Sequence, residues 1–391
     1  MRIALIASPF ISVPPTRYGG TELFIAQLAE GLKTLGLDVV VYANGESRVS
    51  TEVRALYDRD QWPIEGELYA NLKDMNHTAW AVRDAWEEVD IIHLNNAPGL
   101  TFSRFQGPEF VYTIHHPHHD DLSSFYQYYP DVQYVSISNF QKDRERMPRL
   151  RTIHHGVDMS QYQLQEKKGD YLAFLGRIAP LKGTHIAIDV AKKTGVPLKI
   201  AGEVQPIYRE YFETQIEPHI DGKFIEYVGE ADLSAKNELL SNARAMLFPI
   251  QWDEPFGLVM IEAMATGTPV IAFPGGAVPE VISEGVSGHI CRSMDDMLAS
   301  VRELGNRFDP VAVRQYAAEY FSVDRMVKEY AELYGEMMMS SERKRPRSAS
   351  TIVPVSVEFI PEASLQAQLQ QALDEDLTTI TDDPEEPRAI A

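Results

Sequence analysis

Apolar and polar positions follow two alternating periods along this chain. Residues 2–8 (RIALIAS) are mostly apolar, residues 20–36 (GTELFIAQLAEGLKTLG) carry apolar side chains at helical spacing, and residues 37–43 (LDVVVYA) are apolar again. A short apolar run is typical of a buried strand, and a period of three to four residues is typical of an amphipathic helix. This segment therefore predicts a strand, a loop, a helix that Gly36 closes, and a second strand.

The same unit begins again in the middle of the chain. After the polar stretch QLQEKKGD, a second strand, helix and strand are predicted at 170–177, 181–195 and 196–203. Further buried strands are predicted at 90–94, 110–114, 132–137 and 151–157, and then at 223–229, 243–249 and 268–273. Short strands that alternate with helices imply parallel sheets with right-handed crossovers. We expect the α/β class, with two doubly wound domains facing across a cleft.

These patterns also predict the domain boundaries. Residues 1–164 are expected to form the first Rossmann-like domain and residues 165–340 the second, with helical segments after residue 295, including 322–338, closing the second domain. The pattern is lost in 341–391, which is rich in acids and prolines near its end. Such a composition predicts a mobile acidic tail, with one short helix at 363–373.

Composition and charge narrow the class of protein. The 391 residues are 44% apolar and 24% charged, as in globular proteins, and the formal net charge is −21. An acidic chain argues against nucleic acid and anionic lipid as partners. The single cysteine, Cys291, excludes an intramolecular disulfide framework and fits a reducing compartment. The chain has neither a secretory signal nor an apolar run long enough to span a membrane, so we expect a cytoplasmic protein.

Candidate chemistry follows the predicted strands, because ligands bind beyond the carboxyl ends of strands in open parallel sheets. The loop after the first strand ends in Gly19-Gly20 at a helix start. Paired glycines let the backbone approach a ligand, and free N–H groups at a helix N-terminus favour an anion. The loop lacks the G-x-G-x-x-G pattern of dinucleotide sites, and an ordinary turn is the alternative.

Two cations lie in the loop after the first strand of the second domain. Arg177 and Lys182 are five residues apart in GRIAPLKG. An arginine fork and a lysine point charge in such a loop can clamp a diphosphate. A solvated pair of surface charges is the alternative.

A third candidate is the run from Asp253 to Met264, DEPFGLVMIEAM. Pro255 suits the first turn of a helix, and the next residues then offer unpaired N–H groups to an anion. Glu254 and Glu262 are eight residues apart, about two helical turns, so both can project towards one side. A carboxylate pair of this kind accepts hydrogen bonds from hydroxyls, as a sugar offers. The alternatives are a helix cap for Glu254 and a buried salt bridge for Glu262.

A histidine cluster follows the strand at 110–114. It contains His115, His116, His118 and His119, followed by two aspartates. The spacing matches none of the ordinary zinc patterns. We therefore expect no metal here, and we expect only His115, at the strand end, to face the cleft.

Together, these residues make the sequence resemble the retaining glycosyltransferases of family 4, which have the GT-B fold. The resemblance covers roughly residues 1–340 and is carried by Glu254-x7-Glu262 within EPFGLVMIEAMATGTPVIAF, by Gly19-Gly20, by GRIAPLKG and by IAGE ending at Glu203. HHGVD resembles the family's usual N-G-V-D, with His155 in place of the asparagine, which leaves a role for residue 155 open.

The resemblance implies a set of roles. Arg177 and Lys182 would bind the diphosphate of a nucleotide-sugar, and backbone groups of Phe256, Gly257 and Leu258 would meet the sugar and the β-phosphate. Glu254 would hold sugar hydroxyls, Glu262 ribose hydroxyls, and Glu203 would lie near the nucleoside. His115 would face the sugar, and Gly19-Gly20 would approach the phosphate or the acceptor. The implied catalytic group is Glu254, Arg177, Lys182 and His115.

The resemblance also implies the reaction. A hexose, with UDP-glucose as the favoured donor because PPTRYGGTE resembles relatives that glucosylate small molecules, would pass from a UDP- or GDP-sugar to an acceptor hydroxyl without a metal or cofactor. The predicted helix within 66–90 is net acidic, which favours a soluble small molecule or glycan as acceptor. A GT-B sugar-nucleotide epimerase and a non-catalytic sugar-nucleotide-binding protein are the alternatives.

Overall fold

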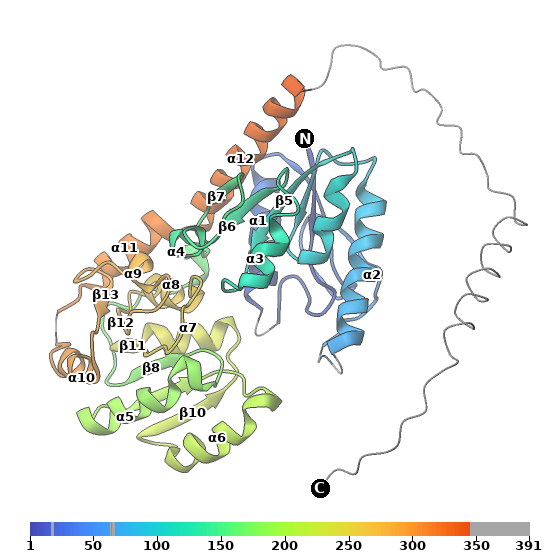
Figure 1. Cartoon of the computed structure of the whole chain (residues 1–391). Coiled ribbons are helices and arrows are strands. Elements are labelled where there is room, and N and C mark those ends of the chain that lie inside the picture. Colours follow the sequence, from blue (N-terminus) through green and yellow to red (C-terminus); the bar gives the residue numbers. More distant parts are fainter. Residues whose placement is uncertain (17–18, 63, 65–66, 306, 345–391) are drawn as a thin grey trace, which may run out of the picture. The chain divides into compact units, whose positions relative to one another are not determined.

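The structure is a computed structural model that describes residues 1–344, apart from residues 17–18, 63, 65–66 and 306 (Figure 1). The predicted acidic tail at 341–391, with its short helix at 363–373, lies outside the described residues, except that the last helix continues to Lys344.

Within the described residues, the first half of the chain builds a seven-stranded parallel sheet in the order β3-β2-β1-β4-β5-β6-β7. Its central strands are apolar and buried on both faces, as expected for a sheet covered by helices on both sides. The bounds are β1 Arg2–Ile6, β2 Asp38–Tyr42, β3 Glu52–Arg54, β4 Ile91–Leu94, β5 Glu109–Ile114, β6 Gln133–Ser136 and β7 Leu150–Thr152.

The second half builds a six-stranded parallel sheet in the order β10-β9-β8-β11-β12-β13. Both strand orders change direction beside the first strand of the sheet, β1 or β8, and this creates the switch point where doubly wound folds bind ligands. The predicted class, two doubly wound α/β domains, is therefore confirmed. The bounds are β8 Leu172–Leu175, β9 Leu198–Ala201, β10 Ile225–Gly229, β11 Ala245–Phe248, β12 Val270–Ala272 and β13 Gly288–Ile290.

Helices connect and cover the strands (Figure 1). The α-helices are α1 Gly20–Thr34, α2 Glu67–Ala85, α3 Asp120–Tyr126, α4 Asn139–Lys142, α5 Thr184–Thr194, α6 Arg209–Gln215, α7 Leu233–Ser241, α8 Leu258–Ala265, α9 Val278–Val281, α10 Met294–Arg302, α11 Pro310–Phe321 and α12 Val323–Lys344. Short 3-10 helices are η1 Ala97–Arg104, η2 Met159–Gln161, η3 Pro180–Lys182, η4 Pro206–Tyr208 and η5 Glu217–His219. No helix among the described residues is both long enough and apolar enough to cross a membrane.

The position of α12 corrects the prediction that the last helices all close the second domain. Tyr330 and Tyr334 of α12 belong to the hydrophobic core of the first sheet, and their hydroxyls bond Thr113 Oγ1 at 2.9 Å and His93 Nδ1 at 2.7 Å. Gly31 of α1 makes this docking close, since a Cβ there would lie 2.3 Å from Val327 Cγ2. The apolar spacing of α12 predicted a buried face but not which sheet would cover it.

The chain passes between the two sheets twice, and the crossings lie side by side. The predicted strand at 151–157 ends at Thr152, and the segment that follows it forms the first crossing. Val157 and Ser322 form an isolated bridge, with Val157 N donating to Phe321 O at 2.9 Å and Val323 N to Val157 O at 3.0 Å. Gly156 permits this approach, because a Cβ there would lie 2.4 Å from Ser322 O.

Candidate functional site

Most of the predicted site residues follow the carboxyl end of a parallel strand. His115 follows β5, Arg177 follows β8, Glu203 follows β9 and Glu254 comes shortly after β11. Gly19 precedes α1 in the long loop after β1. Because ligands bind at the carboxyl ends of such strands, the site is expected at this edge of both sheets.

One cavity, of about 280 Å³, gathers residues from both domains, and we call it the Glu254 cavity. Its wall from the first domain includes the two glycines and His115, and its wall from the second domain includes the cations, Glu254 and the start of α8. Of the predicted residues, it is lined by Gly19, Gly20, His115, Arg177, Lys182, Glu254, Phe256, Gly257 and Leu258.

A second cavity, of about 110 Å³, contains the remaining two predicted residues, Glu203 and Glu262, and we call it the Glu262 cavity. Gly19, Gly20, Arg177 and Leu258 line both cavities, so the two adjoin at the glycine loop and the start of α8. The two glutamates of the E-x7-E motif therefore lie in neighbouring spaces, separated by the residues predicted to meet a diphosphate.

Lys182 and Glu254 form an ion pair within the Glu254 cavity. Lys182 Nζ lies 2.5 Å from Glu254 Oε2, and Trp252 Nε1 donates to the same oxygen at 3.0 Å. The ammonium group also lies 4.6 Å from the centre of the Trp252 ring, a cation–π distance. The predicted alternative, a solvated pair of surface charges, does not describe Lys182, whose side chain is only 18% exposed.

The start of α8 presents backbone N–H groups to the Glu254 cavity. The helix begins at Leu258 rather than at Pro255, which corrects the expected helix start. Gly257 precedes the helix at φ 89°, a left-handed conformation that favours glycine. Met260 N donates to Gly257 O at 3.0 Å, and the backbone N–H groups of this first turn form the positive end of the helix dipole, which attracts anions.

Glu262 is buried and paired. Lys236 Nζ and Tyr162 OH both donate to its Oε1, at 2.8 and 2.9 Å, and its side chain is 2% exposed. Its Oε2 is buried and has no hydrogen-bond partner in the part of the chain that the structure describes. The predicted alternative of a buried salt bridge is thus present, yet it uses only one of the two oxygens.

His115 lies in the Glu254 cavity and is held as a neutral ring. Its Nε2 is 2.9 Å from Asn95 Oδ1, and its ring stacks on that of His155 at 5.6 Å with an interplanar angle of 5°. Burial, then the neighbouring histidines, lowers the pKa of His115 well below its usual range, and burial lowers the pKa of His155 to about 3. His155, whose role the sequence left open, also lines the cavity.

The other histidines of the cluster hold loop structure. His116 Nε2 bonds Tyr126 OH and His118 bonds Glu145 and Asp120, while the His119 side chain is 64% exposed. Among the described residues, the group with ligand atoms close enough for a metal is instead His289, Cys291 and Asp296, whose atoms lie within 4.8 Å of one another.

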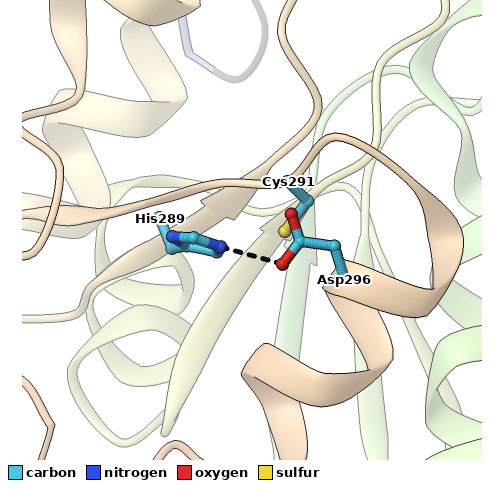
Figure 2. Close-up of side chains that lie close together, drawn as sticks. All are labelled: His289, Cys291 and Asp296. Atoms are coloured by element: carbon cyan, nitrogen blue, oxygen red, sulfur yellow. Dashed lines mark hydrogen bonds and ion pairs between the residues drawn. The ribbon is translucent and has the colours of Figure 1, made fainter.

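His289 is bonded to Asp296 of this group, as Figure 2 shows, and also to Glu284. His289 Nε2 lies 3.1 Å from Asp296 Oδ1, and its Nδ1 bonds Glu284 Oε1, so carboxylates hold the imidazole on both sides. Burial raises the pKa of the Cys291 thiol to about 12, which opposes the thiolate that a metal requires. This group is explained as an ion-pair network between β13 and α10.

Sequence reasoning missed four residues that line the Glu254 cavity or contact the two motif glutamates. Glu22 lines the Glu254 cavity beside the two glycines, and burial raises its pKa to about 7. Trp252, Lys236 and Tyr162 contact the two motif glutamates. Glu22 had a visible signal, since it follows Gly19-Gly20 on the first turn of α1, whereas the partners of Glu262 come from distant parts of the chain.

Models of known protein families match both halves of the chain. The sequence model described as "Glycosyltransferase Family 4" matches residues 18–161, and the model described as "Glycosyl transferases group 1" matches residues 158–304. Two facing Rossmann-like domains with a site between them define the GT-B class. The chain belongs to the glycosyltransferases of the family 4 type within that class.

Curated relatives are distant and differ in coverage. D-inositol 3-phosphate glycosyltransferase of Mycolicibacterium smegmatis is 28% identical over 237 residues, which is 56% of this chain and 53% of that protein, so the match spans about half of its length. Spore coat protein SA of Bacillus subtilis is 24% identical over 76% of this chain and 87% of its own length.

Solved structures agree on the fold. Sucrose-phosphate synthase from Thermosynechococcus elongatus superposes with a TM-score of 0.71 at 17% identity, covering 87% of this chain and 99% of that chain. The Anabaena protein HepE in complex with UDP-glucose has a TM-score of 0.67 at 18% identity, covering 86% of this chain and 100% of that chain. At these identities the likeness establishes the GT-B fold alone.

Proposed function

We propose that this glycosyltransferase transfers a hexose, with glucose the favoured sugar, from a nucleotide diphosphate sugar to an acceptor hydroxyl with retention of configuration. The observation that carries the proposal is the Glu254 cavity, where Arg177, Lys182, the start of α8 and Glu254 line one space. Cations and helix N–H groups suit a diphosphate, and a carboxylate suits sugar hydroxyls. UDP-glucose is the favoured donor because HepE, a structural neighbour, is solved with it.

In the proposed reaction, the bond from the anomeric carbon to the diphosphate oxygen breaks as the acceptor oxygen bonds the same face of that carbon. Negative charge then develops on the diphosphate. Lys182, Arg177 and the start of α8 stabilise this charge as it forms, so these contacts lower the barrier. The departing phosphate oxygen takes the proton of the acceptor hydroxyl, which leaves Glu254 and His115 to hold the sugar.

The lysine–glutamate pair has a defined part in donor binding. Lys182 lies against Glu254 at 2.5 Å, and the donor brings to this place both a negative diphosphate and neutral sugar hydroxyls. The diphosphate attracts Lys182, and the sugar hydroxyls replace the ammonium as donors to Glu254. Because these side chains supply the cationic clamp, we propose that the reaction needs neither a metal nor a cofactor.

The exposed surface of helix α2 indicates the class of acceptor. It exposes Leu68, Leu72 and Met75 in an apolar stripe at helical spacing, beside Tyr69. The segment around this helix is net acidic even though Lys73 lies beside the stripe, with its Nζ 4.7 Å from the centre of the Tyr69 ring, and net acidity disfavours binding to anionic lipid. We therefore propose a soluble acceptor, small molecule or glycan, and a cytoplasmic reaction.

The test is a screen of donors followed by turnover. A ligand at 100 times its Kd adds about 2.7 kcal/mol of stability, so thermal unfolding with UDP-, GDP- and ADP-sugars identifies the donor. Product analysis with that donor, with and without a panel of polyol and sugar acceptors, then separates transfer from epimerisation. Stabilisation by a nucleotide-sugar and acceptor-dependent release of the nucleotide are expected, and a protein that no nucleotide-sugar stabilises would contradict the proposal.

A further inference from the structure

Glu262 is the most constrained carboxylate in the two cavities. It lies on α8, whose other residues from Met260 to Ala265 are buried and apolar. A carboxylate in such surroundings costs several kcal/mol unless it is paired or hydrogen-bonded. Two donors meet this demand, and both act on Oε1, whereas Oε2 has no hydrogen-bond partner among the described residues.

The first donor, Tyr162, belongs to the segment that links the two sheets, and this segment is anchored firmly. Arg314 Nη1 donates to Tyr162 O at 2.8 Å and Arg314 Nη2 to Met159 O at 2.7 Å. Asn237 of α7 bonds both neighbours of the tyrosine, since its Oδ1 accepts from Gln163 N at 2.9 Å and its Nδ2 donates to Gln161 O at 2.7 Å. The phenol therefore approaches Glu262 from a fixed backbone.

The second donor, Lys236, precedes Asn237 on α7 and lines the Glu262 cavity. Its side chain is 21% exposed, whereas that of Glu262 is 2% exposed, so the ammonium group forms the accessible edge of the pair. Lys236 and Asn237, which are neighbours on α7, thus bond Glu262 and the linker, respectively.

We propose that Lys236 and Tyr162 are positioning residues that hold Glu262 for the ribose hydroxyls of the nucleotide donor. The inference rests on the proposed function and extends it to residues outside the E-x7-E motif. Two donors from different elements on one oxygen fix the rotation of the carboxylate. A ribose then meets a carboxylate with free acceptor capacity beside an ammonium donor, and each of its hydroxyls is both a donor and an acceptor.

The test compares ribose recognition in the full chain. Calorimetric titration with UDP and with 2′,3′-dideoxy-UDP isolates the hydroxyls, and the ratio of the two Kd values is insensitive to a general loss of stability. Wild type should bind UDP at least about tenfold more tightly, since hydrogen bonds to a charged group are worth that much in affinity. Lys236→Met and Tyr162→Phe should each reduce the ratio to about threefold or less.

Matched controls come from the same domain. Lys199→Met removes a lysine that pairs with Glu226 at 3.2 Å, and Tyr171→Phe removes a hydroxyl bonded to Leu239 O at 2.8 Å. Neither residue lines the Glu254 or the Glu262 cavity, so both controls should keep the wild-type ratio.

The other outcomes separate this inference from the proposed function. Wild type that binds UDP with a ribose preference, together with variants that keep it, overturns the positioning role alone. Variants that bind UDP more tightly than wild type overturn it too, because Lys236 would then compete with the ribose. Wild type that binds both nucleotides equally shows that Glu262 does not meet the ribose. If wild type binds neither nucleotide, the proposed UDP donor fails, and the inference that rests on it fails as well.

Discussion

The backbone N–H of Asn139 in the first domain is shared between the two carboxylate oxygens of Glu280 in the second, with N···O distances of 2.7 and 2.9 Å. The same carboxylate accepts from Phe140 N at 3.1 Å, and His154 Nε2 in the linker also bonds it. A single acidic side chain thus joins α9, α4 and the linker, beside the cavities in which we place catalysis.

This contact predicts a pH-dependent stability. Burial alone would raise the pKa of Glu280, but hydrogen bonds from His154 and from the N–H groups of Asn139 and Phe140 outweigh it and lower the pKa below 4.5. A lowered folded-state pKa gives stability that is present above pH 4.5 and lost as the pH falls through the folded value. Glu280→Ala should therefore lower the free energy of unfolding by about 2 kcal/mol at pH 7.

Urea unfolding of wild type and Glu280→Ala at pH 7 and pH 4 checks this. The difference between the two proteins should shrink at the lower pH, because the unfolded wild-type chain binds a proton there that the folded carboxylate binds less readily. An equal difference at both values would show that the carboxylate charge does not join the domains.

The Lys182–Glu254 pair predicts a kinetic effect without a loss of fold. Lys182→Ala removes the ammonium that we propose stabilises the leaving diphosphate, so kcat/KM should fall by a factor of about 100 or more. Steady-state release of the nucleotide measures this, and Lys199→Ala serves as a matched control in the same domain. Unchanged kcat/KM in a folded Lys182→Ala protein would remove this lysine from the clamp.

Glu22 predicts a stability that falls with rising pH. Burial raises its pKa from 4.5 to about 7, so the folded protein holds a proton that the unfolded chain loses above pH 4.5. A raised folded-state pKa gives stability that is present below the unfolded pKa and lost as the pH rises through about 7. Relative to Glu22→Gln, wild type should lose up to about 3 kcal/mol between pH 5 and pH 8.

Denaturant midpoints for wild type and Glu22→Gln across that pH range test the expectation. Parallel pH curves for the two proteins would mean that Glu22 is ionised in the folded state throughout. The same variant reports on the acceptor side of the cavity, since a changed acceptor KM with an unchanged donor KM would place Glu22 beside the acceptor.

The docking of α12 on the first domain predicts opposite effects at two glycines. Gly31→Ala would place a Cβ 2.3 Å from Val327 Cγ2 and should cost about 1–3 kcal/mol through overpacking. Gly335→Ala, within α12 itself, meets no atom within 4 Å and should stabilise the helix by about 0.5–1 kcal/mol. Thermal unfolding of both variants measures the contrast, and a Gly31→Ala protein as stable as wild type would show that α12 does not press on α1.

Much of the fold could be predicted from the sequence because long buried strands have a strong apolar signal. The two restarts of the strand–helix–strand unit fix the two sheets, and the strands at β1, β4, β5, β8 and β11 lie where their apolar runs predicted them. The three-residue strands β3 (EVR) and β13 (GHI) were not predicted, since neither contains a run of apolar residues. The partner of α12 was predicted wrongly, because an apolar helix face does not specify the sheet that covers it.

The candidate site was predictable where charged side chains lie in loops at the carboxyl ends of predicted strands. Arg177, Lys182 and Glu254 lie in loops at strand ends, so the fold class alone places them at one edge. Lys236 and Tyr162 were out of reach, because they lie 26 and 100 positions before Glu262 and meet it only through α7 and the linker. A carboxylate among apolar residues in the sequence predicts that partners are present, but the sequence does not identify them.

Retaining transfer from a nucleotide-sugar is tested by the anomeric signal of the transferred sugar. Proton NMR of the product formed from UDP-glucose and an acceptor from the panel reports the configuration at the anomeric carbon. We expect an α-linked product, with the small anomeric coupling of the donor itself, appearing in step with UDP. A β-linked product would contradict retention, and release of UDP without any glycosylated acceptor would contradict transfer.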